Sequence, residues 1–525
     1  MKRLMSVVAF TGLLLDGAFA QSTVPSIPAT LTVKNVKLAG KLKPKPLGTY
    51  IATPNRGAVM LVDIVNMSEQ AGLLLKTSSG PTNPHSSAKT TSTNFPSKGK
   101  VGIGIAGGTR NILRVVGGRL VISGTDFENA LEVELDPLCG EAVESVSLLS
   151  VGDNKYGFVA KNARIGAATS FYVGFTATDD PKESWFIYRV EGMIDNFTTC
   201  PGGCKSSYIR YGQTKNAITF NTNVEDADGR DLGTLITAIP LAKLVAGDPL
   251  IDSYTMQLNE DTYFAKNVAG SIRVNIGASF NEGAMPDTME IMPEAVIGAP
   301  SFINLWNVDT SDMINGLTKV TGQQFTVDTI PETVDVEQGE GDGYPRIISA
   351  GAGIFAPASV VGTTTGASFA VALPYGKNTN LNGVRIFQIA VDAGGVANAC
   401  SESNLIANDR SSLYKPSVQL SNEGKVTLAV VLSNPRKQSI AHHLSFGFAL
   451  LSLSSSRNTP IYLLKPGSVP MAYGSPTAQL SAFNASASTS DGSTLYATEV
   501  AEPVSADLLY DDGVTTAYFY RKEPL

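Results

Sequence analysis

Three closely spaced aspartates are the best candidate for a metal site. Asp226, Asp228 and Asp231 surround Gly229 in the stretch DADGRD. Carboxylates that alternate around a glycine turn can supply several of the roughly six to eight oxygen ligands that Ca²⁺ takes. The later glutamate of an EF-hand loop is missing, and Asp and Gly are also the usual residues of a solvated hairpin tip. The sequence therefore suggests calcium as a candidate ligand beside the simpler hairpin tip, and it predicts no other cofactor.

Residues for acid–base or nucleophilic catalysis form no recognisable motif. The chain has 3 histidines: His85 lies in a polar stretch, whereas His442 and His443 begin the strand-like run HHLSFGFALL. The sequence has no Gly-x-Ser-x-Gly nucleophile elbow, no His-Glu-x-x-His zinc motif and no phosphate-binding glycine loop. The catalytic residues therefore stay unknown, and a role other than catalysis is favoured.

Paired carboxylates offer an alternative chemistry, because glycoside hydrolysis uses two of them on either side of the scissile bond. A propeller would bring such a pair together at its central channel. The candidate acids have no spacing that separates them from ordinary loop residues: Glu290, Glu294, Asp309 and Asp312.

The four cysteines favour disulfides, provided that the chain is exported. Cys200 and Cys204 flank Pro-Gly-Gly and could close a small loop, which leaves Cys139 and Cys400 as a long-range pair. Other connectivities stay open. No histidine lies near Cys200 and Cys204, so a zinc site is disfavoured.

The first twenty residues are typical of an export signal. Lys2 and Arg3 precede a short apolar run, and Ala18-Phe19-Ala20 fits a small-x-small cleavage site before Gln21. The run is shorter than the roughly 20 apolar residues that span a bilayer, and no later segment is long and apolar enough. We expect a secreted, extracellular protein without membrane insertion, with residues 1–20 removed as a signal peptide.

Three sequons are glycosylation candidates if the host is eukaryotic: Asn66, Asn196 and Asn484. The formal net charge is −7, and no basic cluster is present. This argues against nucleic acid as a partner, because lysine and arginine contacts to phosphate dominate such binding.

Short β-rich runs separated by Gly, Asn, Asp and Pro predict an all-β fold. A turn followed by a strand recurs along the chain, as in GGRLVISG and EGKVTLAVVLSN, and a second strand type ends in an acidic residue, as in WFIYRVEG and VRIFQIAVD. This pattern suits propeller blades, which must stack on their neighbours to bury both faces. The alternative is a pair of β-sandwich domains, but no linker divides the chain.

We therefore expect a β-propeller over residues 56–525, with seven blades of about 60 residues each. Residues 21–55 would form an N-terminal segment that completes the closing blade. Residues 76–100 are rich in Ser and Thr and are expected to form a disordered polar insertion. The clearest helical signal is IPLAKLVA, residues 239–246, where Pro240 could open a short helix and Gly247 could end it.

Several motifs resemble exported seven-bladed β-propeller proteins of microbes, most of which have no assigned activity. The matching stretches are FTATDDP with WFIY, Tyr208 with AITFNTNV and AIPLAKLVAG, and GDGYPRIISAGAGIFAPASVV with VRIFQIAVD. The family has Asp and Pro around the tyrosine, where this chain has Ser207 and Ile209. The resemblance implies a fold and an extracellular location, and it brings no catalytic residues.

The sequence thus predicts a monomeric extracellular module that binds a protein or a glycan. An extracellular glycoside hydrolase with paired channel carboxylates is the alternative.

Overall fold

The computed structural model describes the following residues, to which every structural statement below refers: 32–37, 43–70, 90–96, 104–108, 110–116, 118–150, 155–162, 170–191, 204–206, 210–214, 216–226, 231–259, 272–275, 289–297, 301–335, 346–348, 359–363, 366–378, 381–392, 396–420, 425–434, 445–452, 458–465, 477–479, 485–488, 494–502 and 514–522.

Most strands pair with their sequence neighbours in antiparallel meanders of four. The first meander contains β5 (Gly104–Gly107), β6 (Asn111–Val116), β7 (Arg119–Gly124) and β8 (Leu131–Glu134). The second contains β9 (Val143–Ser150), β10 (Tyr156–Asn162), β11 (Phe171–Thr176) and β12 (Ser184–Val190). The third contains β14 (Arg210–Gln213), β15 (Ala217–Glu225), β16 (Asp231–Pro240) and β17 (Leu250–Asn259), with the short β13 (Lys205–Ser206) also paired to β15.

The pattern continues along the chain. The next meander contains β18 (Ile272–Asn275), β19 (Met289–Ile297), β20 (Ser301–Asp309) and β21 (Lys319–Val327). Then come β23 (Ser359–Thr363), β24 (Gly366–Asn378), β25 (Leu381–Asp392) and β26 (Ala397–Ala407), followed by β27 (Ser412–Leu420), β28 (Lys425–Ser433), β29 (Ser445–Ser452) and β31 (Tyr462–Lys465). The last meander joins β33 (Ala485–Ser488), β34 (Thr494–Glu502) and β35 (Val514–Lys522) to β4 (Thr90–Pro96).

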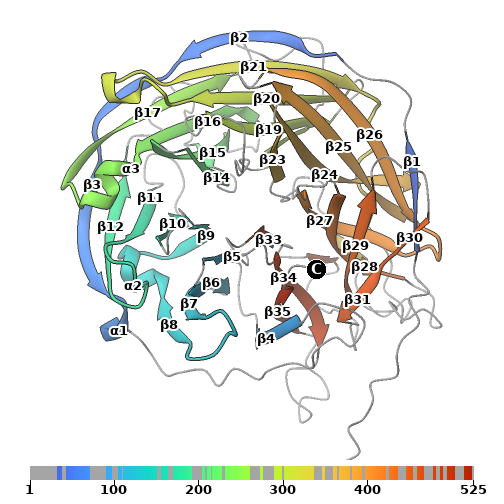
Figure 1. Cartoon of the computed structure of the whole chain (residues 1–525), viewed down its shortest axis with the longest axis horizontal. Helices are drawn as coiled ribbons and strands as arrows, with labels where there is room; N and C mark the ends of the chain where they lie inside the picture. The colour runs from blue at the N-terminus through green and yellow to red at the C-terminus, as the bar shows by residue number, and fades with distance from the viewer. Residues whose placement is uncertain are drawn as a thin grey trace, which may run out of the picture.

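These meanders stand side by side around a common centre, as Figure 1 shows, so the chain folds as a β-propeller. The strands nearest the centre touch their counterparts in the next meander: β5 contacts β9, β9 contacts β14, β27 contacts β33, and β33 contacts β5 again. The predicted fold class is therefore confirmed, and two separate sandwiches are excluded. A short parallel pair, β22 (Arg346–Ile348) with β32 (Thr477–Gln479), lies outside the meanders.

Both faces of a meander are buried, and β12 shows why. Its side chains alternate in direction, so Trp185 and Ile187 pack toward β5–β8, whereas Tyr188 and Val190 pack toward β14–β17. The neighbouring β11 includes Gly174, where an added Cβ would lie 2.1 Å from the Phe158 ring. The meander thus buries both faces against its neighbours, as the sequence predicts for propeller blades.

The helices are short. α3 (Leu241–Ala246) confirms the predicted helix, since Pro240 precedes it and Gly247 ends it with a φ of 73°. α1 (Met67–Gln70), α2 (Leu135–Cys139) and the 3-10 turn η2 (Met313–Asn315) complete the set among the described residues. In that part of the chain no helix has the length and apolar character needed to cross a membrane.

The N-terminal strands depart from expectation. The segment 21–55 contains β1 (Thr32–Lys37) and β2 (Lys45–Ile51), which pair with β26 and β21 rather than with the closing meander. The strand that pairs with β35 is instead β4, which lies inside the polar insertion expected at 76–100. Ser and Thr suit an exposed strand as well as a loop, so composition did not reveal this pairing.

Candidate functional site

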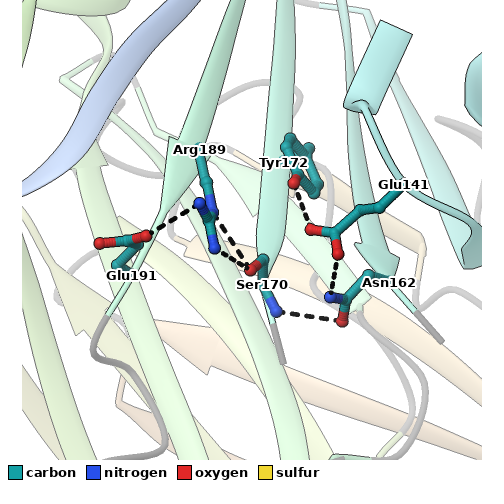
Figure 2. Close-up of polar contacts among 6 residues, drawn as sticks. All are labelled: Glu141, Asn162, Ser170, Tyr172, Arg189 and Glu191. Carbon is teal, nitrogen blue, oxygen red and sulfur yellow. Dashed lines mark hydrogen bonds and ion pairs between the residues drawn. The ribbon is translucent and has the colours of Figure 1, made fainter. Parts of the chain in front are cut away.

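A cluster of polar side chains lies at one end of the β9–β12 meander (Figure 2). Antiparallel pairing brings together the residue before β9, the end of β10, the start of β11 and the end of β12. We call this cluster the Glu141–Arg189 site; its members are Glu141, Asn162, Ser170, Tyr172, Arg189 and Glu191.

The helix α2 positions Glu141. The helix ends at Gly140, whose φ of 70° lies in the left-handed region that favours glycine. The chain then reverses toward β9, and the Glu141 side chain reaches β11 and the end of β10. There the Tyr172 hydroxyl donates a hydrogen bond to Glu141 Oε1, and Asn162 Nδ2 donates to Oε2 at 2.9 Å.

Asn162 and Ser170 close the base of the connection between β10 and β11. The Ser170 backbone N–H donates to Asn162 Oδ1 at 3.0 Å, and the Asn162 N–H donates to the Ser170 carbonyl at 3.1 Å. Asn162 therefore acts as donor to a carboxylate and acceptor from a backbone amide, which fixes the orientation of its side-chain amide.

Arg189 lies opposite Tyr172 across the β11–β12 pair. Its Nε and Nη2 both donate to Ser170 Oγ, at 3.2 and 3.0 Å, and its Nη1 lies 3.2 Å from Glu191 Oε1. The side chains of Arg189 and Glu191 are 39% and 45% exposed. The buried Ser170 thus holds the partly exposed guanidinium of Arg189 in one orientation.

Electrostatics keep Tyr172 as a hydrogen-bond donor. Burial is the main cause that raises the pKa of its hydroxyl, the hydrogen bond to Glu141 acts in the same direction, and Arg189 opposes them weakly. Nearby, burial raises the pKa of the Cys139 thiol to about 12, with the carboxylates of Asp136 and Glu141 adding to the effect. Neither group is ionised near neutral pH, so neither is poised as a nucleophile.

The site offers binding chemistry. It combines two carboxylates, a guanidinium, a carboxamide and two hydroxyls, which are the groups that hydrogen-bond polar ligands. Among the described residues, no group of three or more His, Cys, Asp and Glu is arranged to hold a metal ion.

A second set of charged side chains lies buried between the β18–β21 and β23–β26 meanders. Arg385 Nη1 donates to the Asp328 carbonyl at 2.8 Å and lies 3.7 Å from Glu402 Oε2, while Nε donates to Asn404 Oδ1 at 2.9 Å. The Arg385 and Glu402 side chains are both 6% exposed. Burial raises the pKa of Glu402 to about 7 despite the opposing charge of Arg385.

The predicted calcium ligands lie at the connection between β15 and β16. Asp226 follows β15 directly, Asp231 begins β16 and pairs with Glu225, and Asp228 lies outside the described residues. This position is a hairpin connection, as the simpler interpretation required. The calcium site itself stays a prediction.

The cysteines correct one prediction. Cys139 in α2 and Cys400 in β26 are both buried free thiols, so the long-range pair is not formed. They lie in different meanders, which spacing along the chain did not indicate. Cys204 is buried, but Cys200 lies outside the described residues, so the small-loop disulfide stays a prediction.

The four predicted carboxylates lie in one meander, β18–β21, where Met289, next to Glu290, pairs with Asp309. Asp309 and Asp312 accept hydrogen bonds from Ser311 N and Asn315 Nδ2, so they cap turns beside η2. Glu290 and Glu294 lie on β19, whereas His85, His442 and His443 lie outside the described residues.

Of the sequons, Asn66 ends β3 (Thr53–Asn66), and its Oδ1 accepts the Ser68 N–H at 3.0 Å. Asn196 and Asn484 lie outside the described residues.

Sequence reasoning missed the Glu141–Arg189 site altogether. Its residues come from the ends of three strands and from a helix terminus, with no shared motif. The one available signal was the run WFIYRVEG, where a charged Arg-Val-Glu sequence ends a strand that is otherwise apolar.

Comparison with known proteins gives distant similarities of structure. No protein-family model and no curated protein matches the sequence. A protein of unknown function from Dyadobacter fermentans is 11% identical with a TM-score of 0.34, covering 72% of this chain and 94% of that one. The NanB sialidase from Streptococcus pneumoniae is 9% identical with a TM-score of 0.36, covering 94% of each chain. Xylan beta-1,4-xylosidase from Bacillus halodurans is 10% identical with a TM-score of 0.28, covering 82% of this chain and 99% of that one. Similarity at this level does not identify a shared activity.

Proposed function

We propose that the protein is an extracellular, non-catalytic propeller that binds glycans at the Glu141–Arg189 site. The observation that carries this proposal is Arg189: its guanidinium is held by Ser170 and Glu191 while the side chain stays 39% exposed. A side chain that is already held in place loses little conformational entropy on binding. Three contacts do not use all the N–H donors of a guanidinium, so donors remain for a ligand.

The charge of the site favours neutral over acidic sugars. Glu141 and Glu191 contribute two carboxylates against the single guanidinium of Arg189, and the whole chain has a net charge of −7. An anionic ligand would meet this excess of negative charge, whereas sugar hydroxyls can donate to carboxylates and accept from guanidinium and amide groups.

A glycoside hydrolase is the alternative, and it needs a carboxylic acid that stays protonated near neutral pH. Glu402 has a pKa raised to about 7, but it is buried between two meanders and faces Arg385. The Glu141 carboxylate accepts hydrogen bonds from Tyr172 and Asn162, which suits an acceptor and not an acid. Binding therefore fits the described residues better than hydrolysis.

The test uses the mature chain from Gln21 on arrays of neutral and acidic glycans, with reducing-end release measured in parallel. We expect binding of neutral glycans without release. Arg189→Gln should weaken binding at least tenfold, about 1.4 kcal/mol, because it removes charged hydrogen-bond donors. The matched control is Arg119→Gln, which breaks an arginine–glutamate pair of 2.6 Å in the β5–β8 meander and should leave binding unchanged.

Each other outcome contradicts part of the proposal. Release of sugar would overturn the non-catalytic role. If Arg189→Gln and Arg119→Gln lost glycan affinity equally, Arg189 would not be a binding residue. Absence of binding to every glycan on the arrays would favour an extracellular protein as partner. Loss of binding with EDTA would instead support calcium at Asp226, Asp228 and Asp231.

We infer seven blades, export of a monomer after removal of residues 1–20, and glycosylation at the three sequons where the host permits it. The support for the blade count is strand pairing: the described strands group into seven meanders of four, the last of them closed by β4. Intact-mass measurement of the protein recovered from culture medium tests the cleavage at Gln21 and the glycans together.

A further inference from the structure

The N-terminal strands run around the outside of the propeller. β1 pairs with β26 and β30 (Asn458–Pro460), β2 pairs with β21, and β3 pairs first with β17 and then with β12. Figure 1 shows these strands in blue along the periphery. We call β1, β2 and β3 together the N-terminal strap.

The meanders beneath the strap are complete without it. Each of β9–β12, β14–β17, β18–β21 and β23–β26 has its own four strands, and the strap adds a further strand to the outer edge. β4 differs, because it supplies the fourth strand of the closing meander. Ring closure therefore depends on β4, while the strap occupies edges that are already formed.

The strap is attached through its backbone and a limited set of apolar side chains: Leu47 and Tyr50 pack on the core around Trp306, and Leu61 packs on the core beside β17. Along β2 and β3 only Val59 and Val65 are buried, and Ala52 lies buried between the two strands, while Ile51, Val62 and Ile64 are about half exposed or more. Strand addition to a sheet edge has this character: main-chain hydrogen bonds supply affinity, and a few side chains fix the register.

A polar clasp fixes the register on β17. Asp252 Oδ1 accepts the Gly57 N–H at 2.8 Å, and Asp252 Oδ2 accepts Arg56 Nη1 at 2.7 Å. Gly57 has a φ of 59°, which glycine adopts without strain, and Asn55 Nδ2 donates to Thr255 Oγ1 at 2.9 Å. These contacts hold Asn55, Arg56 and Gly57 in one register on β17.

The edges that β2 and β3 leave unpaired are protected against further strands, whereas β1 lies between β26 and β30. Asp63 Oδ1 accepts the N–H of Ile64 at 2.8 Å, so that amide is not offered to another chain. β2 contains Lys45 and Pro46 and has an irregular register at Pro46. Such features are typical of protected sheet edges, and they limit strand addition to a single strap.

We propose that the outer edges of β12, β17, β21 and β26 form a strand-acceptor surface, and that its partner is the strap segment itself, exchangeable between copies of this chain. In the intact molecule the chain's own strap occupies the surface. A strap from a second copy has the same sequence and would make the same ladders and the same Asp252 clasp. Exchange of the strap does not depend on whether the protein binds glycans.

The test begins with the full chain that carries a site for a specific protease between Gln70 and Thr90. After the folded protein is cut, a fluorescent synthetic peptide of residues 43–66 is added in excess and its uptake is followed by anisotropy and gel filtration. We expect the peptide to replace the cut segment with one peptide per propeller. The uncut chain, in which the tethered strap competes at high effective concentration, should take up far less.

Two variants of the cut chain sharpen the result. Asp252→Asn removes the charge that clasps the 82% exposed Arg56 side chain and should weaken peptide binding about threefold. The control Glu132→Gln breaks the ion pair with Arg119 on β7 and β8, which takes no part in the Asp252 clasp, and should bind the peptide normally. Circular dichroism verifies that each variant is folded.

Failure of the cut, folded chain to take up peptide would overturn the proposal, because the strap would then be an inseparable part of the fold. Equal uptake by cut and uncut chains would overturn it too, since the peptide would then bind elsewhere. If the Asp252→Asn and Glu132→Gln chains bound the peptide with equal affinity, the contacts of Asp252 would not contribute to recognition of the strap.

Discussion

Replacing Glu402 with glutamine should stabilise the protein at pH 8 and leave its stability little changed at pH 4. Glu402 is buried between two meanders, and its Oε2 receives no hydrogen bond although Arg385 lies 3.7 Å away. At that distance the attraction is about 4 kcal/mol for an effective dielectric constant near 20. The pKa is nevertheless raised, so desolvation of the carboxylate outweighs the attraction.

The size of the effect follows from the two pKa values. Glu402 titrates at about 7 in the folded protein and at 4.5 in the reference state. Below pH 4.5 Glu402 is protonated in both the folded and the unfolded state, so its titration does not change the free energy of unfolding there. Between pH 4.5 and 7 the unfolded state loses its proton first, so the free energy of unfolding falls as the pH rises. At about 1.4 kcal/mol per pKa unit, the whole loss is roughly 3 kcal/mol and is complete above pH 7.

The assay is denaturant unfolding of wild type and Glu402→Gln at intervals from pH 4 to pH 8. Glutamine has nearly the same shape and stays neutral, so the difference in unfolding free energy isolates this one titration while all other groups cancel. We expect the difference to grow by about 3 kcal/mol between pH 4 and pH 8 in favour of glutamine. Arg385→Met should have the opposite effect at pH 8, because it leaves the Glu402 carboxylate without its counter-charge.

A difference that stays flat with pH would refute the reasoning, since Glu402 would then ionise equally in both states. A difference that grows in favour of wild type would show that Arg385 more than compensates for burial. Glu128→Gln is the matched control, because it makes the same substitution at an exposed position.

Three further predictions concern the packing of the meanders. Gly174→Ala should destabilise the fold by about 1–3 kcal/mol in thermal or chemical unfolding, because the new Cβ would lie 2.1 Å from the Phe158 ring; an unchanged stability would contradict this packing. Tyr172→Phe should lower the free energy of unfolding by about 1–2 kcal/mol, because it removes the hydroxyl that donates to Glu141. Tyr414→Phe is the comparison, because Tyr414 is a buried tyrosine whose hydroxyl accepts a hydrogen bond from Ser433. Cys139 and Cys400 should resist a thiol reagent in the native protein and react with it after unfolding, because burial raises both pKa values; rapid native labelling would show that they are accessible.

The local sequence determined the elements of this protein. Alternating apolar residues between Gly, Asn and Asp turns predicted strands such as Phe171–Thr176 and Ser184–Val190, and the signals Pro240 and Gly247 predicted α3. The requirement that apolar strands bury both faces predicted the propeller. These features depend on residues close in sequence, so a single chain is enough to reveal them.

Only the tertiary structure decided how distant segments pair. The strap on four meanders, the closing role of β4 within a polar stretch, and the free thiols of Cys139 and Cys400 depend on contacts between residues far apart in the chain. A sheet edge accepts a strand through its backbone, which is nearly the same for every sequence, so pairing partners leave almost no local signature. The Glu141–Arg189 site escaped prediction for the same reason, because strand ends that meet in space share no spacing in sequence.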